Sequence, residues 1–462
     1  MLLKSKIKDL QKIIKPSNIL TSEEECYCYA TDATNIISAV KNPEVVIFVE
    51  NVEEIQKVVK FAYKNEIPII SRGAGTNMVG SCATNKGGIV LNFSKMNKIL
   101  DINVSNMTAL VQPGVVLGDL KQAVENIGLF FPPDPSNYKV STVGGAIAQS
   151  SGGAMTFKYG TTKDYVLSLK VVTGEGKLMT IGANTVKDAV GYHLAQLMVG
   201  SEGTLAIIVE AELKLIPKPE TRRAILAYFD NIDNAVSAVD NIIKAQIFPA
   251  AIDFMDKNAI ATVEDFSKCG LNTDKAGMLL IDLDGYEASM KHQVNTTISA
   301  LQAANVSDIK ISCSEAEADN LWQARRVSFA AAARLAPDVV TDDIIVPRQN
   351  LGKMISRCNE IADKYNLTMC LVGHVGDGNI HPQIALNLED EAEFKTCMEA
   401  KAELYNAAVE LGGTISAEHG VGIEKLPYIR SVVDSNAIEY MKMIKKTFDP
   451  RNILNPGKIF EL

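Results

Sequence analysis

Four glycine-rich turns lie in the first half of the chain, and they constrain its fold more than any other feature. They read RGAGTNMVG at 72–80, PPDPSNYKVSTVGGAIAQSSGG at 132–153, KYGTTKDYV at 158–166 and VGSEGTLAII at 199–208. Glycine lets backbone N–H groups come close to an anion, because it has no side chain in the way. The first turn alone is a weak signal, since it lacks the strand-to-helix setting of a dinucleotide-binding fingerprint. Together, the turns predict a long phosphate-bearing ligand held by backbone contacts within one domain.

The segments between these turns have the periodicity of ordinary helices and strands. Asn51 precedes apolar residues at helical spacing and is followed by Glu54, which predicts a capped helix. The segment 130–155 is rich in Pro, Gly, Ser and Thr and has little periodicity, so we expect a functional loop there. Further strands are expected at 68–70, 87–93 and 108–115, a helix at 117–129, a hairpin at 164–182, and a helix, a turn and a long strand at 191–217.

The pattern changes after IPKPETRR, near residue 220. Strands are predicted at 224–230, 249–256, 277–285 and 308–314, with helices after Asn231 and from Glu287. This order is typical of a split βαβ sheet with helices on one face, and hence of an α+β protein. We expect domains at 1–220 and 221–447, followed by a turn-rich tail at 448–462.

Composition and charge restrict the domain organisation and the classes of partner that this chain can have. The 462 residues exceed one ordinary core, which favours two domains. The net charge of -9, without a long Lys/Arg block, argues against nucleic acid or anionic lipid as partners. The amino-terminal stretch lacks an apolar signal region and no apolar run reaches about 18 residues, so we expect a cytoplasmic protein without a transmembrane segment. The 8 cysteines are scattered and none lie at C-x-x-C spacing, so an iron–sulfur cluster within this chain is not expected.

Three of the 5 histidines lie in two glycine-flanked segments of the second half. In GHVGDGNIHP, the turn at 376–378 can bring His374 and His381 to one point. The segment AEHGVG supplies Glu418 and His419 side by side. Two imidazoles and a carboxylate suit Zn²⁺ or Fe²⁺, although histidines that only cap loop carbonyls are an alternative. Such a metal site can activate water or chelate a substrate, and the spacing does not choose between them.

Ten segments occur in a characteristic order along the chain: RGAGT, PPDP, STVGGAIA, KYGTTKDYV, GSEGTL, PAAIDFMD, LWQARR, GHVGDGNIHP, SAEHGVGIEK and FDPRNILNPGKIF. From about Ser38 to the carboxyl end, the chain resembles the FAD-linked D-2-hydroxyacid dehydrogenases, which include D-lactate dehydrogenases and the glycolate oxidase D-subunit, within the vanillyl-alcohol oxidase superfamily. The resemblance implies a two-part FAD-binding domain, a ferredoxin-like substrate domain with an antiparallel sheet, and a tail that returns to the FAD domain.

The resemblance also implies site residues. The metal ligands would be His374, His381 and Glu418, while His419 would be the base, Arg325 the binder of the substrate carboxylate and Asn379 a polar substrate contact. The residues expected to line FAD are Arg72, Gly73, Ala74, Gly75, Thr76, Asn77, Pro133, Asp134, Thr142, Gly144, Gly145, Gly152, Gly153, Gly160, Glu202, Gly203, Ile208 and Asn455.

Two departures from the family pattern bear on the cofactor. Thr76 stands where relatives with covalent flavin carry histidine, so FAD should be bound non-covalently. Ala146 and Ser150 replace two asparagines of the family's second glycine segment, which alters the hydrogen bonds expected near the flavin.

Local patterns alone give plainer interpretations for four residues. Arg325, in a predicted helix, would be a solvated charge, and Lys425 a surface lysine. Asp377 is interpreted as a turn residue and Trp322 as part of the core.

These parts fit the oxidation of a 2-hydroxy acid. Its carboxylate and hydroxyl can chelate a divalent ion, His419 can remove the hydroxyl proton, and the C2 hydrogen can leave as hydride to flavin N5. We favour D-lactate over glycolate or D-2-hydroxyglutarate, because no second basic residue is assigned to a distal carboxylate. Electrons would pass to a partner such as an electron-transferring flavoprotein or an iron–sulfur subunit. A metal-dependent hydrolase and a dedicated electron-transfer subunit are the alternatives.

Overall fold

The computed structural model describes residues 6–36 and 40–462. Ser38, where the family resemblance begins, lies outside the described residues. The chain forms two compact units. The first takes in residues 1–151, 161–218 and 418–462, and the second takes in residues 152–160 and 219–417.

The segment 418–447 belongs to the first unit, whereas the sequence placed it in the second domain. Its helix α15 (Ser435–Phe448) packs Ile444 and Phe448 against the core of the first unit. The buried Lys445 of this helix donates hydrogen bonds to the carbonyls of Thr204 and Leu454. These contacts fix the assignment, and helical periodicity alone could not reveal them.

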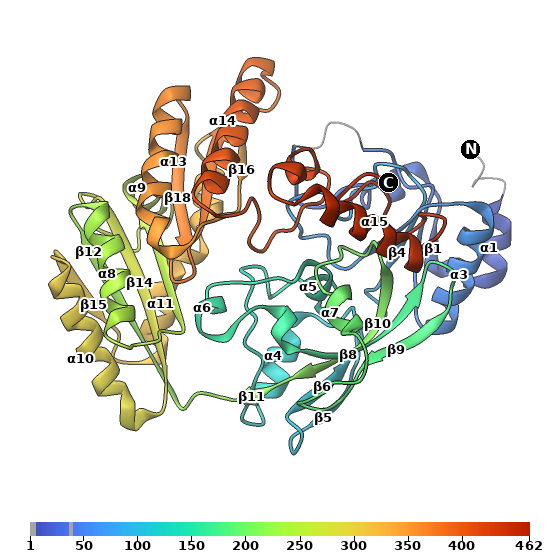
Figure 1. Cartoon of the computed structure of the whole chain (residues 1–462), viewed down its shortest axis with the longest axis horizontal. Coiled ribbons are helices and arrows are strands. Elements are labelled where there is room, and N and C mark those ends of the chain that lie inside the picture. Colours follow the sequence, from blue (N-terminus) through green and yellow to red (C-terminus); the bar gives the residue numbers. More distant parts are fainter. Residues whose placement is uncertain (1–5, 37–39) are drawn as a thin grey trace. The chain divides into compact units, whose positions relative to one another are not determined.

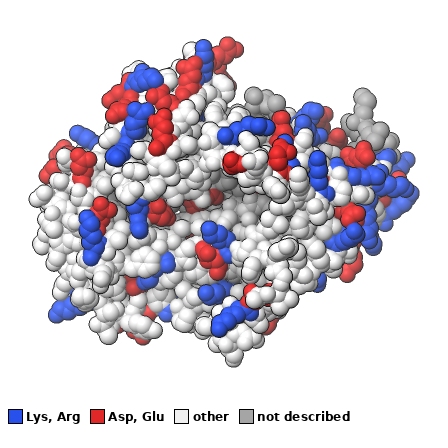
Figure 2. Space-filling model, viewed as in Figure 1, with Lys and Arg blue, Asp and Glu red and all other residues white. Residues whose placement is uncertain are grey.

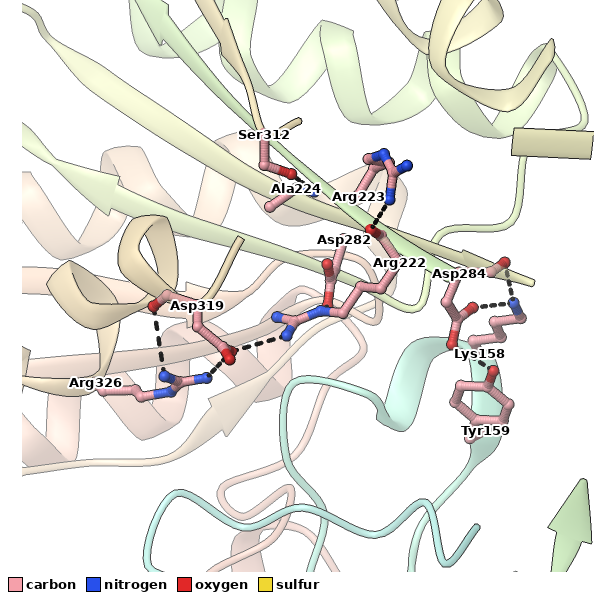
Figure 3. A network of polar contacts seen from close by, with 10 residues as sticks. All are labelled: Lys158, Tyr159, Arg222, Arg223, Ala224, Asp282, Asp284, Ser312, Asp319 and Arg326. Atoms are coloured by element: carbon pink, nitrogen blue, oxygen red, sulfur yellow. Dashed lines mark hydrogen bonds and ion pairs between the residues drawn. The ribbon is translucent and has the colours of Figure 1, made fainter. Parts of the chain in front are cut away.

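A short segment from the first half belongs to the second unit. Residues 152–160 include the one-turn helix α6 (Thr156–Tyr159). Figure 3 shows Lys158 and Tyr159 on Asp284 of strand β14 (Gly277–Gly285), where Lys158 forms an ion pair and the Tyr159 hydroxyl donates at 2.6 Å. Asp284 is almost fully buried, so this polar contact ties the segment to the sheet of the second unit.

The first unit contains two main sheets (Figure 1). In one, strands β2 and β3 pair in parallel with β4, and β1 lies antiparallel to β2. The other is antiparallel, in the order β5-β6-β10-β8-β9, and its β8–β9 pair confirms the predicted hairpin. The strands are β1 (Ile19–Leu20), β2 (Val45–Phe48), β3 (Ile69–Arg72), β4 (Ile89–Asn92), β5 (Ile99–Asn103), β6 (Thr108–Val111), β7 (Leu129–Phe130), β8 (Val166–Thr173), β9 (Leu178–Gly182), β10 (Ala206–Lys214) and β11 (Ile216–Pro217).

Helix α3 shows how the parallel sheet gains its core. Asn51 caps it by accepting a hydrogen bond from the backbone N–H of Glu54 at 2.9 Å, which confirms the predicted start. Its apolar stripe, with Ile55 and Val59, packs on strand residues such as Ile47 and Leu91. The helices of the described part of this unit are α1 (Ile7–Ile13), α2 (Glu23–Tyr27), α3 (Val52–Asn65), α4 (Leu117–Glu125), α5 (Val143–Gln149), α7 (Leu194–Met198) and α15, with 3-10 turns η2 (Pro16–Asn18), η3 (Thr162–Tyr165) and η5 (Leu426–Ser431).

Helix α5 lies in the segment that the sequence predicted to be a loop. The Thr142 side chain caps it by accepting a hydrogen bond from the N–H of Gly145 at 3.3 Å. Gly144 is required by close packing, because a Cβ there would lie 2.6 Å from Cβ of Pro113. Ser150 ends the helix in the left-handed conformation, with a φ of 53°, at one of the two positions where the family has asparagine. Glycines made this helix hard to predict because they lower helix propensity, yet Gly144 is needed for its close packing.

The second unit is built on one antiparallel sheet, in the order β15-β12-β14-β13-β18-β19-β16, with β17 paired to β19. This confirms the predicted α+β class and the antiparallel sheet. The other strands are β12 (Thr221–Phe229), β13 (Ala251–Asp256), β15 (Asp308–Ile311), β16 (Asp338–Thr341), β17 (Ile344–Ile345), β18 (Thr368–His374) and β19 (Asn379–Leu386).

Helices cover both faces of this sheet, so the expectation of a single covered face is wrong (Figure 1). On one face of β12, Leu226 and Tyr228 pack in a core with residues of α9 and α11. The intervening Ala227 points to the opposite face and is also buried, and α8 and α10 contact β12 and β14. The other helices are α8 (Ile232–Lys244), α9 (Lys257–Ser267), α10 (Glu287–Ala303), α11 (Glu315–Arg326), α12 (Ser328–Ala332), α13 (Leu351–Tyr365), α14 (Glu391–Glu410) and the 3-10 turn η4 (Arg348–Asn350).

Surface charge is mixed in sign on the face drawn in Figure 2. Basic and acidic side chains are interspersed there, including over α13 and α14. Alternating signs cancel at a distance, so this face does not present the one-sign field that a nucleic-acid backbone needs. Within the described residues, no helix combines the length and the apolar character needed to cross a bilayer.

A buried carboxylate makes the stability of the second unit depend on pH. Asp256 is 5% exposed and caps α9 by accepting a hydrogen bond from the N–H of Ala259 at 2.8 Å. Burial raises the pKa of Asp256 to about 7, against the lowering effect of hydrogen bonds from the Ala259 and Leu371 backbone. In the unfolded chain an aspartate has a pKa of about 3.9. Between these values the folded protein keeps a proton that the unfolded chain has released, so stability falls as the pH rises.

We therefore expect Asp256→Asn to stabilise the protein at pH 8. Asparagine keeps the capping oxygen and cannot ionise, and the gain in unfolding free energy should be about 2–4 kcal/mol. A thermal melt should show a Tm higher by at least about 4 °C at pH 8, with a smaller difference at pH 5. The exposed cap Asp390, which accepts hydrogen bonds at the start of α14, is the control, and Asp390→Asn should show no such pH-dependent gain. A Tm difference for Asp256→Asn that is equal at both pH values would contradict the expectation.

Candidate active site

The first unit contains a cleft that is bordered by its glycine-rich segments. Many of the residues predicted to bind a cofactor line the cleft, namely Arg72, Gly73, Ala74, Gly75, Thr76, Asn77, Thr142, Gly144, Gly145, Glu202, Gly203 and Ile208. The predicted metal ligand Glu418 and the predicted base His419 line it as well.

The first glycine turn forms a wall of the cleft. Strand β3 ends at Arg72, whose guanidinium donates a hydrogen bond to the Thr31 carbonyl at 2.6 Å. A Cβ on Gly75 would collide with that guanidinium, and Gly75 has a φ of 72°. A Cβ on Gly73 would collide with the Thr142 side chain. The two glycine-rich segments therefore lie against each other, and their backbone groups border the cleft without side chains to fill it.

Glu202 and Asn77 hold the segment around His419 at the cleft. The Glu202 carboxylate accepts hydrogen bonds from the N–H groups of Val421 at 2.7 Å and Gly422 at 2.9 Å. Burial raises the pKa of Glu202, while these bonds and one from a serine hydroxyl favour its charged form. The Asn77 amide donates to the His419 carbonyl at 2.9 Å. Both side chains thus hold the segment around His419 in addition to lining the cleft.

Some predicted cofactor residues do not line this cleft. Gly152, Gly153 and Gly160 belong to the second unit. Asn455 is buried and is not part of the lining. Its amide donates hydrogen bonds to the carbonyls of the lining residues Ser81 and Glu202, both at 2.7 Å. Pro133 and Asp134 are also absent from the lining, which includes their neighbours Pro135, Ser136 and Asn137 instead.

Sequence analysis missed other residues of the lining. Cys82 and Phe93 border the cleft, and neither lies in a pattern that distinguishes it from an ordinary core or loop residue.

The second unit brings the two histidines of the GHVGDGNIHP segment together. His374 ends β18 and His381 lies on β19, and the turn between the strands contains Gly378, with a φ of 94°. Their ring centroids lie 5.2 Å apart, with the ring planes at 82°. The Asp377 side chain accepts a hydrogen bond from the N–H of Asn379 at 3.2 Å, as expected of a turn residue.

Hydrogen bonds fix which nitrogen of each imidazole can bind a metal ion. His381 Nδ1 donates to the Asp342 carbonyl at 3.2 Å, and His374 Nδ1 lies 2.8 Å from Oδ1 of Asp253. A proton on Nδ1 leaves the lone pair on Nε2. Both rings then present the same nitrogen, which is the arrangement typical of histidines that hold a divalent ion.

Asp253 also holds Arg325. Its Oδ2 lies 2.7 Å from Nε of Arg325, whose side chain is 14% exposed, and Nη1 of Arg325 donates to the Ser328 hydroxyl at 3.2 Å. Burial opposes the charge on Asp253, but His374 and Arg325 outweigh that effect and lower its pKa. The interpretation of Arg325 as a solvated helix charge is therefore wrong, whereas Trp322 of the same helix lies in the core as predicted.

Asp342 and Asp343 are two further buried residues beside His381, and the sequence did not indicate them. Asp342 is buried with Lys401, at 3.0 Å from its Nζ, and accepts a hydrogen bond from the Tyr405 hydroxyl at 2.9 Å. Asp343 accepts hydrogen bonds at 2.9 Å from the Ser416 hydroxyl and from the backbone N–H of the next residue, 417. The chain that leads into Glu418 is thereby anchored in the second unit, and a TDDII segment carried no local sign of this role.

Asn379 and Lys425 differ from their predicted settings. Both amide hydrogens of Asn379 are used, one for Asp343 Oδ1 and one for the Ile344 carbonyl, both at 2.9 Å. Asn379 can therefore offer only its amide oxygen to a substrate. Lys425, in the first unit, is 1% exposed, so the expectation of a surface lysine is wrong.

Comparison with known proteins identifies the two halves. Residues 43–182 match the FAD binding domain family, and residues 218–459 match the C-terminal domain of FAD linked oxidases. Glycolate oxidase subunit GlcD of Bacillus subtilis (strain 168) is 41% identical over 460 residues, which cover 100% of this chain and 97% of that protein. D-lactate dehydrogenase of Anaerostipes hadrus is 33% identical, with 97% of this chain and 96% of that protein covered.

Solved structures show the same fold. The match to p-cresol methylhydroxylase with substrate bound has a TM-score of 0.83 at 16% identity and covers 99% of this chain and 97% of that one. The match to 4-ethylphenol oxidase from Gulosibacter chungangensis has a TM-score of 0.79 at 18% identity and covers 99% and 97%. The chain thus has the same fold as these two proteins.

The chain belongs to the FAD-linked oxidases, in the group that includes glycolate oxidase subunits GlcD and D-lactate dehydrogenases. The residues present suit FAD, because the glycine-rich segments around Gly73 and Gly144 border the cleft with backbone groups, and residues 43–182 match the FAD binding domain family. The metal-dependent hydrolase finds no support, since both domain matches are to FAD-linked families.

Proposed function

We propose that this protein oxidises a small D-2-hydroxy acid, with D-lactate as the favoured substrate, to the 2-oxo acid. The observation that carries the proposal is the buried Asp253 carboxylate, which lies against both His374 and Arg325. A histidine suited to a metal ion and an arginine suited to a carboxylate are thereby held beside each other. A 2-hydroxy acid needs this pair of partners, because its hydroxyl and carboxylate are on adjacent carbons.

Each residue has a defined task in this proposal. When bound, FAD supplies a two-electron acceptor, and a divalent ion on His374, His381 and Glu418 supplies a Lewis acid for the substrate hydroxyl and carboxylate. Arg325 binds the substrate carboxylate through its guanidinium, and the amide oxygen of Asn379 accepts a hydrogen bond. His419 accepts the proton of the substrate hydroxyl. Fe²⁺ and Zn²⁺ both suit the nitrogen and oxygen donors.

The substrate is tested by anaerobic titration of the purified protein with D-lactate, L-lactate, glycolate and D-2-hydroxyglutarate. We expect D-lactate to bleach the flavin absorbance at the lowest concentration. Glycolate is the second candidate, because the GlcD relative from B. subtilis is 41% identical over nearly its whole length. A flavin that none of these acids bleaches would contradict the proposed function.

The electron acceptor is proposed to be a protein partner, either an electron-transferring flavoprotein or an iron–sulfur subunit. None of the 8 cysteines lies at the C-x-x-C spacing of common cluster ligands. Fast reduction of the flavin by substrate, together with slow turnover with soluble dyes, would support a dedicated partner. Fast turnover with molecular oxygen would argue against one.

The cofactor should be released by denaturation. Thr76 lines the cleft at the position where covalent flavoproteins of this superfamily carry histidine, and a threonine hydroxyl is not expected to form that bond. Precipitation with trichloroacetic acid should leave all of the yellow FAD in the supernatant. A yellow, washed pellet would contradict this prediction.

A further inference from the structure

The local structure places one carboxylate between two predicted functional side chains. Asp253 on β13 lies directly opposite His374 on β18 in the antiparallel register of these strands. Ala251 and Met255, two residues before and after it, lie in the core with Trp322 of α11. Because side chains alternate along a strand, Asp253 points to the same face. The end of α11, which carries Arg325, therefore reaches this carboxylate.

The two oxygens of Asp253 serve different partners. Oδ1 lies 2.8 Å from Nδ1 of His374, and Oδ2 lies 2.7 Å from Nε of Arg325. The Asp253 side chain is 1% exposed, so it is shielded from water that could replace either contact. The positions of the imidazole and the guanidinium are thus set by the same buried group.

We propose that Asp253 is a positioning residue, which fixes His374 as a metal ligand and Arg325 as the binder of the substrate carboxylate in one arrangement. This inference rests on the proposed function and deepens it. Contact with the carboxylate keeps the proton of His374 on Nδ1 and directs Nε2 toward the ion. Contact through Nε leaves Nη2 of Arg325, together with the N–H of Nη1 that does not donate to Ser328, to bind an anion. Metal affinity and substrate binding therefore depend on one side chain that touches neither ligand.

The network in Figure 3 supplies a matched control. Asp282 lies on the neighbouring strand β14, with a side-chain exposure of 2%, and its Oδ2 lies 2.6 Å from Nε of Arg222. Asp282 is therefore, like Asp253, a buried carboxylate paired with an arginine. Arg222 lies on the same sheet as Asp282, whereas Arg325, the partner of Asp253, lies on helix α11. Asp282 and Asp253 differ in that Asp253 also contacts a histidine.

The test measures metal affinity in the FAD-loaded full-length protein, freed of metal by a chelator. Zn²⁺ is titrated in competition with a chromogenic chelator into wild type, Asp253→Asn and Asp282→Asn. We expect Asp253→Asn to bind Zn²⁺ about 10–100-fold more weakly, and Asp282→Asn to bind it as wild type does. Oxalate, added at saturating Zn²⁺ and followed through the flavin spectrum, should also bind more weakly to Asp253→Asn than to Asp282→Asn. Equal affinities of the two variants for both probes would overturn the proposal.

A measurement on the wild type keeps the inference testable if Asp253→Asn does not fold. In protein labelled with ¹⁵N histidine, His374 should show its proton on Nδ1 before and after Zn²⁺ is added, with the change in shift at Nε2. The signal is assigned with His374→Gln. Zinc bound through Nδ1, or a proton on Nε2, would refute the role of Asp253. If the wild type neither binds Zn²⁺ nor is reduced by any hydroxy acid, the proposed function itself fails. If the wild type binds Zn²⁺ and Asp253→Asn binds it equally well, only the role of Asp253 is rejected.

Discussion

Replacing His381 with alanine is expected to slow flavin reduction by the hydroxy acid at least about 10³-fold, since a bound metal ion stabilises the transition state by several kcal/mol. His381 is 5% exposed, and its Nδ1 hydrogen bond to the Asp342 carbonyl directs Nε2 to the proposed ion. Elemental analysis of the purified variant should show the loss of the metal, while the FAD content should stay at the wild-type level, because the flavin cleft is built from the first unit.

His292 provides the control for this change. It is an exposed histidine on α10 of the same unit, so His292→Ala removes an imidazole without touching the proposed site. We expect it to keep the metal and the rate of flavin reduction. A His381→Ala protein that is reduced at the wild-type rate would refute the role of this histidine.

Arg325→Lys is expected to weaken substrate binding roughly 10–100-fold, measured as the concentration of D-lactate that gives half the maximal rate of flavin reduction. A hydrogen bond to a charged group contributes about 1.5–3 kcal/mol to binding, and lysine cannot form two parallel N–H···O hydrogen bonds with a carboxylate. Lysine also lacks the Nε group that contacts Asp253 at 2.7 Å.

The adjacent Arg326 is the matched control, because it lies on the same helix and pairs with the exposed Asp319. Its side chain is 51% exposed, and such ion pairs contribute little. Arg326→Lys should therefore leave the half-maximal concentration unchanged. Equal effects of the two substitutions would show that Arg325 does not bind the substrate.

Much of the fold could be predicted from the sequence, because local patterns and chain order agree. The capped helix after Asn51 and the β8–β9 hairpin follow directly from periodicity and turn residues. Helix α5 could not be predicted in this way, since Gly144 and Gly145 lower helix propensity and only the contact with Pro113 shows why they are needed. The assignment of 418–447 also depended on long-range packing, which sequence spacing does not encode.

The candidate site was partly visible in the sequence. His374 and His381 could be paired, because a glycine turn between two strands has a definite geometry. Arg325 could be selected only through the family resemblance, since local periodicity favoured a solvated helix charge. Asp253 and Asp343 were missed because strand pairing and chain topology, which no short motif reveals, bring them to the histidines.

The most direct test of the whole account is single-turnover reduction of the flavin in protein that retains FAD but has been stripped of metal. Fe²⁺ or Zn²⁺ is added in steps, and stopped-flow absorbance follows the anaerobic reaction with the hydroxy acid that bleaches the flavin best. The account predicts slow reduction without metal and a rate that rises until one equivalent is bound. Full-rate reduction by the metal-free protein would contradict it.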